Sequence, residues 1–273
     1  MEPTAVQASD DRTAGRRPFV FRGDHGPVVA TAIHAGHDLR GEVERRIALP
    51  EAARLREEDP YTDRIIQPAG FRVVVRRSRF EVDLNRGRDD AVYSDTDDTW
   101  GLQVWDGPLP DRLVRRSLDV YDEFYARLAE HLDRLAERGP FVVLDVHSYN
   151  HRRRGPRAAA APAAENPDLN VGTGSLERDR WGPVVDTLID TLDGSEVAGR
   201  PLDVRENVRF TGANLARWVN DRYPDTGCAL ALEFKKTFMD EWTGRVDRDH
   251  LQDLAGTVED AVPAVVDIIG DHR

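Results

Sequence analysis

Short apolar segments alternate along this chain with long amphipathic ones, and this alternation constrains the fold more than any other feature of the sequence. Segments typical of buried strands occupy residues 27–33, 71–76, 79–84, 141–146 and 228–234. Segments with helical periodicity occupy residues 111–138, 179–192, 212–223 and 249–269. Strands of nearly continuous apolar residues, separated by helices, are typical of a parallel sheet that is covered on both faces. The sequence therefore predicts an α/β fold with a largely parallel sheet.

The length of 273 residues and a hydrophobic fraction of 40% are sufficient for one large α/β domain. We expect residues 18–273 to form this single domain. Residues 1–17 lack the apolar stretch of a signal peptide, and we expect them to form a mobile tail on a cytoplasmic protein. Residues 151–175 are rich in proline, alanine and glycine and directly follow a predicted strand, so we expect an irregular loop there.

The single cysteine and the net charge exclude several classes of protein. Cys228 has no second cysteine to pair with, and its apolar neighbours favour a core position over a nucleophilic role. A net charge of −12 disfavours binding to nucleic acid or to an anionic membrane. No apolar segment approaches the roughly 20 residues that cross a bilayer. The arginines of 151–157 could guide acidic substrates, but a solvated loop is the favoured interpretation, and no pattern indicates an oligomeric state.

Polar side chains follow the ends of four predicted strands, where ligands of open α/β sheets gather. These residues are His34 and His37, Asn85 and Arg86, His147, and Glu233. Each alone is commonly an ordinary loop residue, but independent loop residues should scatter rather than collect at one edge. By alternation, Glu233 also shares the small-residue face of its strand with Ala229 and Ala231, which leaves room for a substrate.

The histidines and the glutamate at these strand ends are the residue types that zinc-assisted hydrolysis requires. Zinc binds these donors in near-tetrahedral geometry and lowers the pKa of a bound water to about 7. A glutamate can shuttle the proton, and an arginine can bind a carboxylate with two parallel hydrogen bonds. The sequence contains no HExxH, GxSxG, Walker A or GxGxxG motif, so it offers no support for metalloproteases of that type, serine hydrolases, P-loop enzymes or dinucleotide enzymes.

Six motifs between residues 28 and 240 together resemble a known family. They are AIHAGHDLR, YTDRII, SRFEVDLNR, DVHS, NPDLNVGT and ALEFKKTFM, in that order. In this order they resemble the N-formylglutamate amidohydrolase family, which is related to the zinc carboxypeptidases and the aspartoacylases. The resemblance implies a phosphorylase/hydrolase-like three-layer α/β sandwich with a mixed, largely parallel sheet. It also implies one zinc ion and a small anionic substrate.

The resemblance also implies roles for particular residues. His34 and His147 match the first and last zinc ligands, and Asp63 is the favoured middle ligand, with His37 as the alternative. Catalytic roles fall on two residues, Glu233 as general acid/base and Arg79 as the group that polarises the scissile carbonyl. Asn85 and Arg86 match the pair that holds the substrate carboxylate. Asp145, two residues before His147, is expected either to orient a ligand imidazole or to be a buried acid bonded to backbone amides.

The side chains at the four strand ends, together with the resemblance, imply an amidohydrolase that releases an acyl group, with formyl as the leading case, from an N-acyl acidic amino acid such as N-formylglutamate. A carboxypeptidase-like peptidase or another N-acyl amino acid deacylase would keep the same site with a different substrate. A carboxylate-binding protein without activity is a third alternative, against which Glu233 argues.

Overall fold

The computed structural model describes residues 16–23 and 26–271. The predicted tail, residues 1–17, therefore lies outside the described residues except for its last two positions. Of these, Arg16 points back to the domain, with Nη1 3.4 Å from Asp38 Oδ2. No helix in the described ranges is both long enough and apolar enough to span a membrane.

A mixed sheet of seven strands forms the centre of the molecule, in the order β1-β3-β2-β4-β9-β5-β8. Its strands are β1 (Phe19–Gly23), β2 (Val28–Ala32), β3 (Phe71–Val75), β4 (Phe141–Tyr149), β5 (Leu169–Gly172), β8 (Val204–Glu206) and β9 (Gly227–Lys235). The four central strands β3, β2, β4 and β9 are mutually parallel, whereas β1 and β5 pair antiparallel with their neighbours. A separate hairpin joins β6 (Glu196–Val197) to β7 (Arg200–Pro201). The prediction of a mixed, largely parallel sheet is confirmed.

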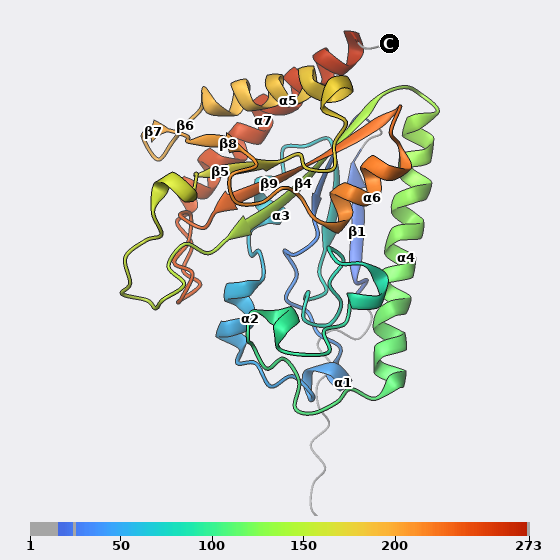
Figure 1. Cartoon of the computed structure of the whole chain (residues 1–273), viewed down its shortest axis with the longest axis vertical. Helices are drawn as coiled ribbons and strands as arrows, with labels where there is room; N and C mark the ends of the chain where they lie inside the picture. The colour runs from blue at the N-terminus through green and yellow to red at the C-terminus, as the bar shows by residue number, and fades with distance from the viewer. Residues whose placement is uncertain (1–15, 24–25, 272–273) are drawn as a thin grey trace, which may run out of the picture.

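Helices cover both faces of this sheet, so the molecule has three layers (Figure 1). One face packs on α4 (Asp111–Ala136) and α6 (Asn214–Arg222). The other face packs on α3 (Thr62–Ile65), α5 (Arg178–Asp193) and α7 (Arg248–Asp271). Two further short helices, α1 (Gly41–Glu44) and α2 (Glu51–Glu57), lie in the loops beyond the carboxyl ends of the central strands.

The long helix α4 illustrates why the sequence forms these layers. Its buried residues recur every three or four positions and include Tyr121, Phe124, Leu128 and Leu132. They pack against the aromatic and branched residues of β1 and β3 on one side of the sheet. After the helix, Gly139 adopts a positive φ of 140°, and the chain turns directly into β4.

Residues 79–84 do not form the strand that their alternation predicts; residues 79–81 form a turn, and a second turn begins at residue 84. The N–H groups of Glu81 and Val82 both donate to the carbonyl of Ser78, as in a helical turn. The alternation arises because Phe80 and Val82 enter apolar clusters while Glu81, equally buried, pairs with Arg40. The period of two therefore reflects burial on both sides of a turn rather than a pleated strand.

The predicted irregular loop 151–175 is only partly irregular. Residues 150–168 contain no strand and only a short 3-10 helix, Ala163–Glu165. The next residues form β5, which pairs antiparallel with β9 and places Asn170 opposite Glu233. The prediction missed this strand, as well as β1 and β8, at the two edges of the sheet.

Gly36 allows the loop after β2 to approach the neighbouring strand. A Cβ atom at this position would lie 2.2 Å from the carbonyl carbon of Arg76, which no side chain could tolerate. The close approach lets the N–H of Asp38 donate to the carbonyl of Arg76 at 2.9 Å. The glycine between His34 and His37 thus holds this loop against β3.

Candidate active site

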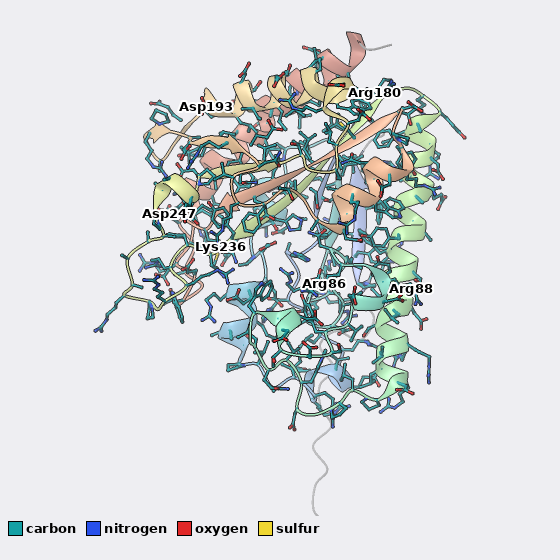
Figure 2. The ribbon with its side chains drawn as sticks, in the orientation of Figure 1. Arg86, Arg88, Arg180, Asp193, Lys236 and Asp247 are labelled. Atoms are coloured by element: carbon teal, nitrogen blue, oxygen red, sulfur yellow. The ribbon has the colours of Figure 1, made fainter. Side chains whose placement is uncertain are left out.

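The parallel strands β2, β4 and β9 bring three of the predicted residues to one edge of the sheet. His34 follows β2, while His147 and Glu233 lie on β4 and β9 and are directly opposite each other in register. All three line one cavity of about 260 Å³. Arg86, from the loop after β3, and Lys236, just after β9, line the same cavity and are labelled in Figure 2.

Three buried side chains in this cavity could hold a metal ion: His34, Asp59 and His147. Their ligand atoms all lie within 4.8 Å of one another. Asp59 Oδ2 is 3.4 Å from His34 Nδ1 and 3.0 Å from His147 Nδ1. Each side chain is at most 4% exposed, so water competes little for these atoms.

Two further carboxylates fix the orientation of both imidazole rings. His34 Nε2 donates to Asp83 Oδ1 at 2.8 Å, and His147 Nε2 donates to Asp145 Oδ2 at 2.9 Å. The hydroxyl of Thr31 in turn donates to Asp145 Oδ1 at 2.6 Å. A histidine that uses Nε2 as a donor keeps the Nδ1 lone pair for a metal. Asp145 is therefore a buried acid that orients an imidazole, one of the two expectations stated for it.

A buried nitrogen atom of His34 also indicates that this group could bind a divalent cation. His34 Nδ1 is buried, points toward Asp59 and has no hydrogen-bond partner among the described residues. An unpaired buried nitrogen is costly unless a ligand satisfies it. Two imidazole nitrogens and one carboxylate, with space in the cavity for a further ligand, match the donors that catalytic zinc sites use.

The imidazoles and carboxylates of the site shift one another's pKa values. Burial alone would raise the pKa of Asp59, but the hydrogen bond from His147 and the nearby imidazole of His34 outweigh burial and hold this pKa well below its usual range. Burial would lower the pKa of His147, yet the nearby charge of Asp145 raises it well above the ordinary value. Both shifts have one cause, which is the direct pairing of carboxylates with imidazoles, because each favours the charged form of the other.

A buried lysine supports the segment that carries Asp59. Lys236 Nζ donates to the carbonyl oxygens of Arg56 and Glu58, at 2.7 and 2.6 Å, and lies 3.9 Å from Asp59 Oδ1. On the other side, the N–H of Asp59 donates to the carbonyl of His34 at 2.9 Å. These contacts hold the turn between α2 and α3 beside the end of β2.

Arg79 lines the cavity, and its guanidinium forms an ion pair with Asp83. Its Nη2 is 2.7 Å from Asp83 Oδ2, its Nε donates to the hydroxyl of Tyr93 at 3.2 Å, and its guanidinium lies over the ring of Trp100. Burial would lower the pKa of Arg79, but the charge of Asp83 raises it well above the usual value. Arg79 is therefore a fixed cation at the wall of the cavity.

Asn85 and Arg86 also line the cavity. The side-chain amide of Asn85 lies 3.3 Å from His147 Nε2, and its Oδ1 accepts the N–H of Leu215 at 3.0 Å. Arg86 Nη1 is 3.2 Å from Asp98 Oδ1, and its guanidinium lies over the ring of Tyr93. Asn85 is thus oriented by contacts with both His147 and Leu215, whereas Arg86 is oriented by contacts outside the group of His34, Asp59 and His147.

Glu233 lies on the small-residue face of β9, as the alternation predicts. Ala229 packs on the α4 side of the sheet, while Leu230 and Leu232 pack on the α7 side. Burial raises the pKa of Glu233 to about 7, despite the opposing charge of His147. A carboxyl group with this pKa exchanges protons readily at neutral pH.

The structure does not bring either predicted middle ligand to the two histidines. Asp63 lies on α3 and lines a different pocket, where its carboxylate is 3.7 Å from Arg64 Nε. His37 lines that other pocket as well, and its Nδ1 is bound to Glu58 Oε2 at 2.5 Å. Tyr61, with a left-handed φ of 71°, turns the chain between Asp59 and α3, so Asp63 leaves the cavity.

Asp59 is the residue that the sequence analysis missed. It ends the run Glu57–Glu58–Asp59 and precedes Pro60, and this acidic run before a proline was the available signal. Helix α2 ends at Glu57, and Glu58 is already extended. Proline disfavours a helical conformation for the preceding residue, so Asp59 lies beyond the helix, and its carboxylate faces His34. Glu57 also lines the cavity, where its carboxylate accepts a hydrogen bond from the amide of Asn150. The carboxylate of Glu58 is bound by His37 and Ser78 instead.

Fold and site together define an α/β protein with a buried His–Asp–His group that could bind a metal at the carboxyl edge of its sheet. The family model described as N-formylglutamate amidohydrolase matches residues 26–239, and the chain therefore belongs to this family of hydrolases. No curated protein sequence gives a significant match.

Two solved structures share the fold over nearly their whole length. The N-formylglutamate amidohydrolase from Ralstonia eutropha JMP134 superposes with a TM-score of 0.72 at 18% identity, covering 94% of this chain and 99% of that one. A gene product from Agrobacterium tumefaciens superposes with a TM-score of 0.64 at 15% identity, covering 93% and 97% of the two chains. At these identities the likeness establishes the fold alone.

Proposed function

We propose that this protein is a zinc-dependent amidohydrolase with one metal ion, which His34, Asp59 and His147 hold. The proposed reaction releases an acyl group, formyl in the leading case, from an N-acyl acidic amino acid such as N-formylglutamate. One observation carries the metal assignment. The Nδ1 atoms of both histidines face one oxygen of Asp59, while separate carboxylates hold both Nε2 atoms. Membership of the family supports the substrate class.

Zinc, when bound, would supply the Lewis acid that activates water near neutral pH. The protein must then supply a group that moves protons. Glu233 lines the same cavity, and burial raises its pKa to about 7. We propose that its carboxylate takes a proton from the attacking water and passes it to the nitrogen of the leaving amine.

Two parts of the cavity wall would recognise the substrate. Arg79, a cation oriented by Asp83 and Tyr93, is suited to stabilise negative charge that develops on the scissile carbonyl oxygen. Asn85 and Arg86 are proposed to hold the substrate carboxylate. Asp98 binds only one side of the Arg86 guanidinium through its side chain and backbone, so a carboxylate would share this cation with Asp98.

The test of the metal assignment uses a matched pair of variants, Asp59→Asn and Asp63→Asn. Both remove one negative charge, and the two residues are separated by only three positions in the chain. We expect Asp59→Asn to lose zinc and deformylation of N-formylglutamate together, because two imidazoles alone hold zinc poorly. We expect Asp63→Asn to retain both. Loss of zinc in Asp63→Asn, or full zinc in Asp59→Asn, contradicts the assignment.

The substrate is tested with the zinc-loaded protein on a panel of N-acyl amino acids and short peptides. We expect the highest kcat/KM for an acylated acidic amino acid. Preference for a peptide would favour the carboxypeptidase-like alternative, and preference for another acyl group would favour another deacylase. Tight binding of a carboxylate without turnover in zinc would favour the non-catalytic alternative.

A further inference from the structure

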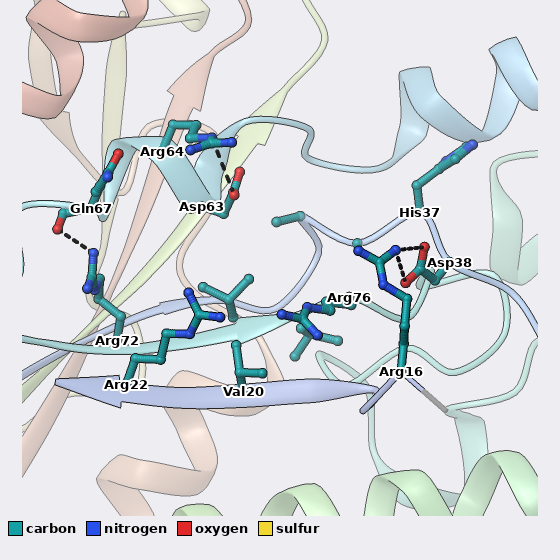
Figure 3. A pocket seen from close by; sticks show the side chains of 14 residues that line it. Arg16, Val20, Arg22, His37, Asp38, Asp63, Arg64, Gln67, Arg72 and Arg76 are labelled. Atoms are coloured by element: carbon teal, nitrogen blue, oxygen red, sulfur yellow. Dashed lines mark hydrogen bonds and ion pairs between the residues drawn. The ribbon is translucent and has the colours of Figure 1, made fainter. Parts of the chain in front are cut away.

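A second pocket, of about 310 Å³, lies on the face of β1 and β3 that does not pack against α4 (Figure 3). On the α4 side, these strands contribute apolar residues to the core. Residues at the alternate positions line the pocket instead; they are Val20 and Arg22 of β1, Arg72 and Val74 of β3, and Arg76 just beyond β3. The face of β1 and β3 that packs on α4 is therefore apolar, and the opposite face, which lines the pocket, carries arginines.

The arginines of this face are close together in the sheet. Arg22 and Arg72 are directly opposite each other in the antiparallel register. Arg76 projects from the same face of β3, four residues beyond Arg72. Like charges that face each other across two strands destabilise the pair. This arrangement becomes favourable when an anion lies between the guanidinium groups.

The acidic residues of the rim do not neutralise these arginines. Asp38 pairs with Arg16 at 3.4 Å, and Asp63 pairs with Arg64 at 3.7 Å, so both carboxylates are engaged with other arginines. In the described part of the chain, no carboxylate lies within 4.0 Å of the guanidinium groups of Arg22, Arg72 and Arg76. Three cations that have no carboxylate partner among residues 16–23 and 26–271 thus line a hollow in a protein whose net charge is −12.

We propose that this pocket, lined by Arg22, Arg72 and Arg76, binds a small multivalent oxyanion. The planar fork of arginine matches phosphate and carboxylate oxygens with paired hydrogen bonds. Arg72 already donates one Nη1 bond to the carbonyl of Gln67 at 2.7 Å, which anchors its position while other N–H groups remain for a ligand. The ligand carries either phosphoryl groups or several carboxylates.

This pocket is separate from the proposed active site. The two cavities share no lining residue. The anion site therefore does not depend on the proposed function, and substitutions in it leave the catalytic groups in place.

The test is isothermal titration of the zinc-loaded protein at low ionic strength with inorganic phosphate and, separately, with citrate. The test variant carries Arg22→Gln and Arg76→Gln. The control variant carries Arg115→Gln and Arg138→Gln, which remove the same charge from exposed positions outside the pocket. Chelation of zinc by citrate affects all three proteins equally. A difference in affinity between the two variants therefore measures binding in the pocket.

We expect the unmodified protein and the control to bind at least one of the two anions with affinities within twofold of each other. The test variant should bind that anion at least tenfold more weakly. Tighter binding of phosphate identifies a phosphoryl ligand, and tighter binding of citrate identifies a polycarboxylate. Absence of binding to the unmodified protein overturns the proposal. Equal binding by the test variant would show that any anion binds elsewhere, and it also overturns the proposal.

Discussion

Glu233 is the residue whose proposed role is the most sharply testable by a single substitution. Glu233→Gln keeps the shape of the side chain and removes its basicity. We expect kcat to fall by about 10²–10⁴, with folding, zinc content and KM little changed, because proton transfer contributes about this factor. Steady-state kinetics with metal analysis measure all three quantities.

A matched control for this variant is Glu137→Gln, at an exposed position after α4, which should retain full activity. Turnover at the unmodified rate in Glu233→Gln refutes the proposed proton shuttle. Loss of zinc in that variant would instead make Glu233 a metal ligand.

At the scale of single residues, the predicted strand ends indicate several residues of the cavity correctly. The sequence of the turn between the short helices α2 and α3 does not indicate which acid faces the histidines. His34, His147 and Glu233 line the cavity from the ends of strands, where the strand-end argument places them. Asn85 and Arg86 line the same cavity from a turn, because residues 79–84 do not form the predicted strand. The middle acid could not be predicted, because its position depends on local turns that have no periodic pattern. The left-handed Tyr61 separates Asp59 from Asp63 and sends them to different pockets.

At the scale of elements, the turn between α2 and α3 depends on one buried amine. Lys236→Met removes the donor for two backbone carbonyls, and we expect it to lower the free energy of unfolding by about 2–4 kcal/mol. Because the same turn carries Asp59, we also expect weaker zinc binding. Denaturant unfolding and competition with a zinc chelator measure the two effects.

The neighbouring lysine is a suitable control for this prediction. Lys235 Nζ binds Asp168 and the carbonyl of Asn166, away from the zinc-binding group. Lys235→Met should lower stability while zinc affinity is unchanged. Equal loss of zinc affinity in both variants would mean that Lys236 does not act through the turn of Asp59.

The edge formed by β5 and β8 depends on a buried carboxylate. Burial would raise the pKa of Asp168, but hydrogen bonds from Arg200 and Lys235 lower it to about 2. Because the folded-state pKa lies below the unfolded value of about 3.9, this group stabilises the fold above about pH 4 and loses its contribution as the pH falls through 2.

Asp168→Asn removes this pH-dependent contribution. We expect the variant to be about 1–2 kcal/mol less stable at pH 7 and the difference to vanish between pH 4 and pH 2. Unfolding curves measured across this range test the expectation. A difference that is constant with pH would show that the Asp168 carboxylate is not stabilised by its ion pairs.

For the molecule as a whole, hydrophobic periodicity predicts the interior better than the edges. The parallel strands β2, β3, β4 and β9 and the helices α4, α5, α6 and α7 follow it, because each buries an apolar face. The strands β1 and β8, at the two edges of the sheet, and β5, next to β8, have three to five residues each. Long-range pairing rather than local pattern determines them. Local pattern is also misleading at residues 79–84, where a turn that is buried on both sides has the same alternation of residue types as a strand.

The central claim is that His34, Asp59 and His147 together hold a metal ion. The most direct measurement is an anomalous-scattering map at the zinc edge from crystals of the zinc-loaded protein. The account predicts one peak within about 2.0–2.3 Å of Nδ1 of both histidines and of an Asp59 oxygen. A peak beside Asp63 or His37, or no peak in this cavity, would contradict it.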